Sequence, residues 1–170
     1  MERSVVGFTL RVPTEEDAYV WHELFDDPEV MEFHGGRAHS VAVYEELTAR
    51  QRAHDATLGY CLWTVLSPSG VPVGFVGAQP WQPQDWGPVG EIEIGWRLGR
   101  EHWGQGYATR CAQETLRRLK EMGVPRAVAM VAEGNHRSAA VAERLEMRHV
   151  ESFTIPHRGT RGRRYELALA

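Results

Sequence analysis

The sequence predicts an α+β, or α/β, fold in which a mixed, mostly antiparallel sheet of seven strands is flanked by helices. Three observations support this prediction. The turn Ser67-Pro68-Ser69-Gly70 separates two strand-like runs as in a β-hairpin, residues 108–122 carry apolar or small residues at helical spacing, and residues 126–132 read as another strand. The full element order expected from the chain is βααβββαβαββ.

The first part of the chain is expected to contain one strand and two helices. Residues 5–12 read as the strand, and Pro13-Thr14-Glu15-Glu16-Asp17 begins a helix with a capping residue and acids in its first turn. This helix ends where Asp26-Asp27-Pro28 follows. Ser40 caps the second helix, which is expected to extend to about Asp55.

The remaining elements alternate strands with two further helices. Three strands are expected at residues 59–66, 71–79 and 89–98. Gly123-Val124-Pro125 ends the helix that follows them. After the strand 126–132 and a short helix, a terminal hairpin is expected at residues 149–155 and 163–169, joined by the basic loop from His157 to Gly162.

Length and composition predict one globular domain over residues 1–170, with 42% hydrophobic and 25% charged residues. Polar residues interrupt every apolar run well before the ~18 residues that a bilayer requires, and the N-terminus has no signal pattern. A cytoplasmic protein with no membrane partner is therefore expected. Cys61 and Cys111 are expected as buried thiols rather than a disulfide or metal pair. The histidines have no paired spacing, so no metal site is predicted.

The net charge of −4 conceals an asymmetry between the two parts of the chain. Residues 1–100 contain 7 basic and 15 acidic residues, whereas residues 101–170 contain 12 basic and 8 acidic ones. A basic C-terminal part suits a phosphorylated ligand, and an acidic N-terminal part suits a cationic amine, although both can be merely solvated surfaces. The basic residues form no long run, so no nucleic-acid partner is expected. A homodimer is left open.

The segment from Trp96 to Thr109 runs from a strand through a glycine-spaced turn into a helix. Gly104 and Gly106 allow close backbone approach, and the free N–H groups of the helix start make an anion cradle, which predicts a phosphorylated cofactor. The loop lacks the Gly-Lys-Ser/Thr ending that ATP and GTP sites need. The sequence partly matches the dinucleotide-binding fingerprint, and Glu133 lies near the place where that fold has the acidic residue that binds the ribose. The preceding strand, however, alternates polar and apolar residues, unlike a buried parallel strand.

A second segment, Val131 to Leu145, is a strand end followed by a helix that begins at Asn135. Together the two segments resemble the GNAT acetyltransferase superfamily. The Trp-Gly-Gln-Gly-Tyr-Ala-Thr run and the Asn-x-x-Ser helix start are most similar to the RimJ/RimL-type enzymes, which acetylate protein N-terminal amines, and to their small-molecule relatives. The resemblance covers most of the chain and implies the GNAT fold.

This resemblance implies that acetyl-CoA is the cosubstrate. Residues 96–98 would offer backbone groups to pantetheine, residues 104–109 would hold the pyrophosphate by main-chain amides, and Asn135 and Ser138 would lie beside the thiol and pantetheine. The implied cofactor-binding residues are Trp96, Arg97, Leu98, Trp103, Gly104, Gln105, Gly106, Tyr107, Ala108, Thr109, Asn135 and Ser138.

Three residues depart from the family pattern. Trp103 replaces the usual Gln or Arg before the first glycine of the turn. Ala142 stands where many relatives have the Tyr that protonates the leaving thiolate. Glu146 stands where a Gly usually ends the second helix.

Acetyl transfer to an amine requires a neutral amine, an oxyanion donor and a group that stabilises the departing thiolate. Glu91 and Glu93 lie two positions apart on a predicted strand, so both are expected on one face, where a paired carboxylate raises one pKa. Glu93 is the preferred base. Alternatively, both carboxylates line a solvent-exposed face of the sheet or bind a cationic acceptor without taking part in catalysis. Ser138 is the expected thiolate partner.

Acceptor contacts are predicted in two segments. Trp81 and Trp86 lie in a Pro- and Gln-rich loop, where exposed indoles favour a binding wall. Phe33 and His34 belong to a segment that could close the same opening, although His34 is equally well explained as a surface residue.

The leading function is acetyl transfer from acetyl-CoA to a primary amine, by direct attack in a ternary complex. The alternatives are a non-catalytic acyl-CoA sensor and, third, a dehydrogenase.

Overall fold

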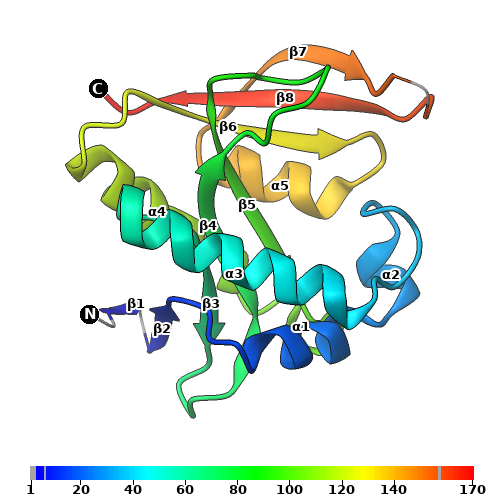
Figure 1. Cartoon of the computed structure of the whole chain (residues 1–170). Helices are drawn as coiled ribbons and strands as arrows, with labels where there is room; N and C mark the ends of the chain where they lie inside the picture. Colours follow the sequence, from blue (N-terminus) through cyan, green and yellow to red (C-terminus); the bar gives the residue numbers. More distant parts are fainter. Residues whose placement is uncertain (1–2, 6, 157) are drawn as a thin grey trace.

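The computed structural model describes residues 3–5, 7–156 and 158–170, which build one eight-stranded sheet with helices on both faces (Figure 1). The order across the sheet is β1-β2-β3-β4-β5-β6-β8-β7. Every neighbouring pair is antiparallel except β5 and β6, which are parallel. The strands are β1 Arg3–Val5, β2 Phe8–Arg11, β3 Leu62–Leu66, β4 Pro72–Pro80, β5 Ile92–Leu98, β6 Arg126–Ala132, β7 Arg148–Thr154 and β8 Arg161–Ala168.

The helices are α1 Asp17–Phe25, α2 Pro28–Met31, α3 Val41–Leu58, α4 Tyr107–Glu121 and α5 His136–Arg144, with a 3-10 turn at Arg100–His102. The predicted mixed, mostly antiparallel sheet with flanking helices is confirmed. Two additions distinguish the structure from the predicted order. The expected single strand at residues 5–12 is a hairpin of β1 and β2, so the described residues contain eight strands rather than seven.

The hairpin turns at Gly7, whose φ of 86° is a left-handed conformation that glycine adopts without strain; Val6 lies outside the described residues.

The second addition is the one-turn helix α2. Asp27-Pro28 was expected only to end the preceding helix, but the Asp27 carboxylate accepts a hydrogen bond from the Glu29 N–H at 2.9 Å and Pro28 occupies the first turn. The same residues therefore separate α1 from α2. His157, at the start of the predicted basic loop, also lies outside the described residues.

A reciprocal cap holds the start of α1 against the sheet. The Thr14 N–H donates to the Asp17 carboxylate at 2.9 Å, and the Asp17 N–H donates to the Thr14 hydroxyl at 3.3 Å. Asp17 also accepts hydrogen bonds from Arg11 on β2 and from the Thr64 hydroxyl on β3. The predicted N-terminal cap is thus also a connection between α1 and two strands.

Two apolar layers enclose the sheet. On one face, residues of α1, α2 and α3 pack against Leu62 and Phe75. On the other face, α4 and α5 cover the larger core, which includes Cys61 and Cys111 as free, buried thiols. Within the described ranges, no helix is both long and apolar enough to cross a bilayer.

The sheet is weakly joined between β5 and β6. These parallel strands pair only at Glu93 and Val128, near the middle of β6, while β5 remains paired with β4 along its length. The second half of β5 therefore has one backbone edge without a strand partner. The turn before α4 and the start of α5 both follow the carboxyl ends of these two strands, where ligands bind in many α/β sheets.

Candidate active site

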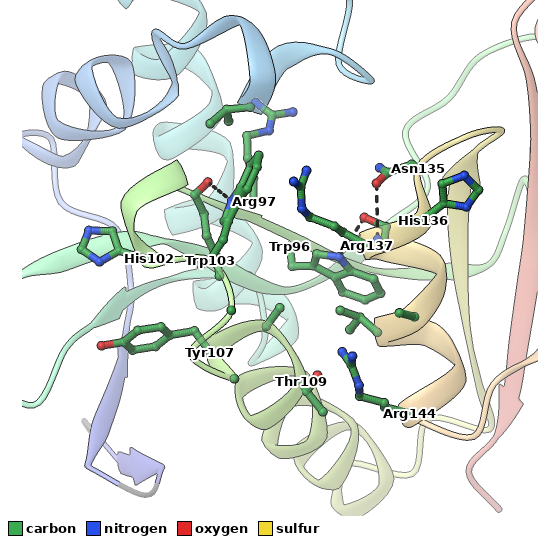
Figure 2. A pocket seen from close by; sticks show the side chains of 18 of the residues that line it. Trp96, Arg97, His102, Trp103, Tyr107, Thr109, Asn135, His136, Arg137 and Arg144 are labelled. Carbon is green, nitrogen blue, oxygen red and sulfur yellow. Dashed lines mark hydrogen bonds between the residues drawn. The ribbon is translucent and has the colours of Figure 1, made fainter.

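A cavity of about 860 Å³ lies where β5 and β6 separate (Figure 2). Its wall is formed by Trp96, Arg97 and Leu98 of β5, the turn that precedes α4, the first turns of α4 and α5, and residues 29–34 in and after α2. Figure 2 shows side chains from β5, α4 and α5 around one space. Segments distant in the sequence thus contribute to a single site.

The predicted glycine turn forms an anion cradle. Gly104 and Gly106 have φ angles of 74° and 88°, in the left-handed region that favours glycine. No side chain caps α4, and among the described residues no hydrogen bond acceptor meets the N–H groups of Tyr107, Ala108 and Thr109. Three amide donors at the positive end of a helix therefore remain available for an anion.

The cavity wall is strongly basic. It contains four arginines but one carboxylate, that of Glu29, which already pairs with Arg100 at 3.1 Å. The arginines are Arg97, Arg110, Arg137 and Arg144. This excess of positive charge favours a ligand with several negative charges.

Trp103 joins the end of β5 to α5. Its indole N–H donates to the Leu98 carbonyl at 3.0 Å, and the Arg137 guanidinium lies over its ring at 4.2 Å from the centroid. A cation–π contact of this kind contributes about 0.5–2 kcal/mol. The tryptophan at this position thus orders both the strand end and one of the cavity arginines.

The start of α5 is capped from within the site. The Asn135 side chain accepts a hydrogen bond from the Ser138 N–H at 3.3 Å, and the Ser138 hydroxyl accepts one from the Trp96 indole at 3.2 Å. Because the hydroxyl oxygen is held by Trp96, the hydroxyl proton of Ser138 is free to be donated. Asn135 and Ser138 both line the cavity.

The structure brings all but one of the predicted cofactor-binding residues to the cavity wall. The exception is Gln105, whose exposed side chain donates to the Glu101 carbonyl at 3.2 Å. Of the predicted acceptor contacts, Phe33 and His34 line the cavity. Trp81 and Trp86 do not: Trp81 donates to the Trp86 carbonyl, and Trp86 packs near Phe153 of β7, with ring centroids 5.6 Å apart.

The two predicted catalytic carboxylates have different surroundings, and neither is part of the cavity wall. Glu91 precedes β5 and forms an ion pair with Arg126 of β6. Glu93 accepts a hydrogen bond from the Gln79 amide at 3.2 Å, and burial raises its pKa against the opposing effect of that bond. The two carboxylates do not pair with each other.

A chain of buried amides extends from Glu93 into the core beneath α3. Gln79 accepts a hydrogen bond from the Gln51 side chain at 2.8 Å, and Gln51 accepts one from the Leu62 N–H at 2.9 Å. Each amide therefore has a fixed orientation, and the last donor in the chain is aimed at the Glu93 carboxylate. The position of Glu93 is thus set by the backbone of β3.

Comparison with known proteins identifies the family. The model of the acetyltransferase (GNAT) domain matches residues 8–148. The chain belongs to the GNAT acetyltransferase family. A relative, the uncharacterized protein YkkB of Bacillus subtilis (strain 168), is 29% identical over 140 residues, which are 81% of this chain and 79% of YkkB.

Solved acetyltransferase structures share the whole fold. A GNAT-family acetyltransferase from Bacillus anthracis superposes with a TM-score of 0.81 at 22% identity, covering 99% of both chains. RimL, a ribosomal L7/L12 α-N-protein acetyltransferase solved with coenzyme A, gives 0.79 at 16% identity over 99% of this chain and 98% of its own. YncA of Salmonella typhimurium, solved with acetyl-CoA, gives 0.73 at 17% identity over 96% and 95%.

Several cavity residues of this GNAT domain were not predicted from the sequence. On α4, Arg110 and Gln113 follow Gly106 by one and two helical turns, and on α5, Val141 and Arg144 follow Arg137 in the same way. Helical spacing from the predicted Gly106 would have indicated Arg110 and Gln113, whereas Arg137, from which the α5 positions are counted, was itself not predicted. Ala142, at the position of the family tyrosine, is fully buried and does not line the cavity.

Proposed function

We propose that this GNAT protein transfers the acetyl group of acetyl-CoA to a primary amine, on a small molecule or at a protein N-terminus. The observation that carries the proposal is the basic cavity at the separated ends of β5 and β6, with three free amide donors at the start of α4. The similarity of the Trp103–Thr109 turn to the RimJ/RimL-like branch, and the fold shared with RimL, support an α-amine acceptor.

The residues present fit coenzyme A. The free N–H groups of Tyr107, Ala108 and Thr109 suit a pyrophosphate, and Arg110 and Arg144 supply further positive charge at the same wall. The unpaired edge of β5 at residues 96–98 offers backbone groups to the amides of pantetheine. When bound, acetyl-CoA supplies a thioester that an unprotonated amine can attack.

Glu93 is the proposed proton acceptor for the amine, through an intervening water, because its carboxylate is not part of the cavity wall. An acceptor amine is an ammonium ion at neutral pH and must lose a proton before it can act as a nucleophile. Burial raises the pKa of Glu93, which makes it a better proton acceptor, while Gln79 holds the carboxylate in place. Ser138, whose hydroxyl proton is free, is the proposed partner of the departing thiolate.

The experiment is acetyl-CoA turnover with a panel of amines, amino acids and peptides, followed by release of free thiol. Thiol release that depends on an acceptor is expected, together with acetyl-CoA binding in its absence. Acetyl-CoA binding with no turnover on any acceptor would favour the non-catalytic sensor, which the missing tyrosine at Ala142 motivates. Failure to bind acetyl-CoA would overturn both.

A further inference from the structure

Arg97 is partly buried and carries a charge that no carboxylate of the described residues neutralises. It lies on β5, and its guanidinium is 5.4 Å from the ring centroids of both Phe25 and Phe75, on the face covered by α1 and α3. Its Nε is fully buried with no hydrogen bond partner, and among the described residues Arg97 forms no ion pair. The guanidinium remains charged because arginine does not lose its proton in proteins.

A partly buried charge with no counter-ion is unfavourable, because charged groups removed from water are normally paired. The two aromatic rings offset part of this cost through cation–π contacts. Arg97 is therefore well placed to bind an anion that enters the cavity.

The acidic side chains before and within α2 do not serve as the counter-ion. Asp27 and Glu29, at the start of α2, both pair with Arg100, at 2.9 Å and 3.1 Å. Asp26 lies near the Tyr44 hydroxyl but forms no ion pair with Arg97. None of these described carboxylates therefore neutralises Arg97, which leaves its charge available to a ligand.

Two further groups lie beside Arg97. The buried Tyr44 hydroxyl lies against the guanidinium, whose charge and polar contact act to lower the pKa of Tyr44, although burial, the larger effect, raises it. Tyr44 does not line the cavity, so it positions Arg97 rather than contacting a ligand. His34 is neutral at physiological pH, because burial, Arg97 and His39 lower its pKa to about 3. A neutral imidazole keeps one N–H to donate.

The group is open to the cavity. Arg97, His34 and Phe33 all line it, and Figure 2 shows Arg97 among the side chains that surround the space. The position of Arg97 on the sheet face opposite α4 separates it from the anion cradle at the start of that helix. The cavity thus has two distinct places for negative charge.

We propose that the acetyl acceptor is an amine that also carries a carboxylate, and that Arg97, with His34 beside it and Tyr44 positioning its guanidinium, binds this carboxylate. A guanidinium matches a carboxylate with two parallel hydrogen bonds. This inference rests on the proposed N-acetyltransferase function, since it names the class of acceptor for that reaction.

The test compares product analogues that differ only in the carboxylate. N-acetylglycine, N-acetyl-β-alanine and N-acetyl-γ-aminobutyrate, each beside its primary amide, are titrated calorimetrically into protein saturated with CoA. At least one acid is expected to bind about 10- to 100-fold more tightly than its amide, the range for hydrogen bonds to a charged group. Equal binding of every acid and amide by the unaltered protein would overturn the proposal, whatever any variant does.

Variants test whether Arg97 is the residue that causes the preference for the acid over the amide. Arg97→Gln should reduce the acid-to-amide ratio to about one, Arg97→Lys should leave an intermediate ratio, and Tyr44→Phe should lower it severalfold. Arg117→Gln removes an arginine of α4 that lies outside the cavity wall and pairs with Glu114, so it is the control and should keep the ratio. An acid preference that survives in Arg97→Gln contradicts the assignment. Binding of CoA by Arg97→Gln reports that the variant is folded.

The two hypotheses fail in different ways. If CoA itself does not bind, the proposed transferase function fails, and the acid and amide titrations without CoA then decide the Arg97 site. If CoA binds but acids and amides bind equally, the transferase function stands and the carboxylate site is wrong.

Discussion

Glu93 and Glu91 lie two positions apart, yet their contacts give them different chemistry. Glu93 ends a buried chain of amides and has a raised pKa, whereas Glu91 is neutralised by Arg126. The sequence pattern supported a pair on one strand face. It contained no sign of Arg126, which is distant in the chain and reaches Glu91 only because β6 lies beside β5.

The first prediction concerns Glu93→Gln. The limiting rate of acetyl transfer at neutral pH should fall by roughly 10- to 1000-fold, around the range for a lost general base. In the unaltered protein the rate should decline as pH falls through the raised pKa of Glu93, because only the carboxylate accepts a proton. The variant should lose that acidic limb in a pH-rate profile. Glu91→Gln is the control, and a larger loss in that variant would mean that the wrong carboxylate was chosen.

Arg97 illustrates what the sequence could not reveal about the site. Its backbone was expected to contact pantetheine, because it lies within the family motif. The role of its side chain depends on Phe25, Tyr44 and Phe75, which come from three separate elements. Such surroundings exist only in the folded chain, whereas the glycine turn and the start of α5 are local and were predictable.

At the scale of elements, the beginning of α4 tests the anion cradle. Gly106→Val places a β-branched residue at a φ of 88°, which strains the backbone by about 1–3 kcal/mol and disturbs the amide donors of the first turn. Binding of CoA, measured by calorimetry, should be lost.

Gly123→Val is the matched control for this variant. Gly123 has a φ of 82° and follows the other end of α4, where an added Cβ would meet no atom within 4 Å. It should show a comparable loss of thermal stability but normal CoA affinity. Near-normal affinity in Gly106→Val would contradict the cradle.

The end of α5 gives an element-scale prediction about stability. Glu146 has a φ of 62°, and its N–H and that of Met147 donate to the carbonyls of Glu143 and Ala142, so the helix ends in a Schellman motif without the usual glycine. Glu146→Gly should raise the free energy of unfolding by about 1 kcal/mol, measured by urea denaturation. Unchanged or lower stability would show that the Glu146 side chain compensates for its strained backbone.

Element boundaries were predictable where a glycine or proline next to the element marks its end. The strand expected at 126–132 is β6 without change, because Gly123 and Pro125 fix its start. The β1–β2 hairpin was missed because an alternating pattern continues across Gly7. The helix α2 was missed because Asp27-Pro28 both ends one helix and begins another, so one signal had two consequences.

At the scale of the whole molecule, His34 links the cavity to pH stability. Its pKa is about 3 in the folded protein against an ordinary 6.5, because of burial and the charges of Arg97 and His39. As pH falls from 6.5 toward 3, the unfolded chain binds this proton before the folded one does, so stability should fall. His34→Asn should lose less stability than the unaltered protein between pH 7 and pH 5 in urea titrations. An identical loss in both would contradict the assignment.

The separation of β5 from β6 has a thermodynamic consequence for the molecule. Five strands lie on one side of this junction and three on the other, joined in the ladder only at Glu93 and Val128. A ligand that contacts both β5 and the start of α5 acts in place of the missing strand pairing. At a concentration 100 times its dissociation constant, such a ligand would add about 2.7 kcal/mol to the free energy of unfolding. The stability of the chain in a cell would therefore follow the supply of its own cosubstrate, and the purified, ligand-free protein would be the less durable form.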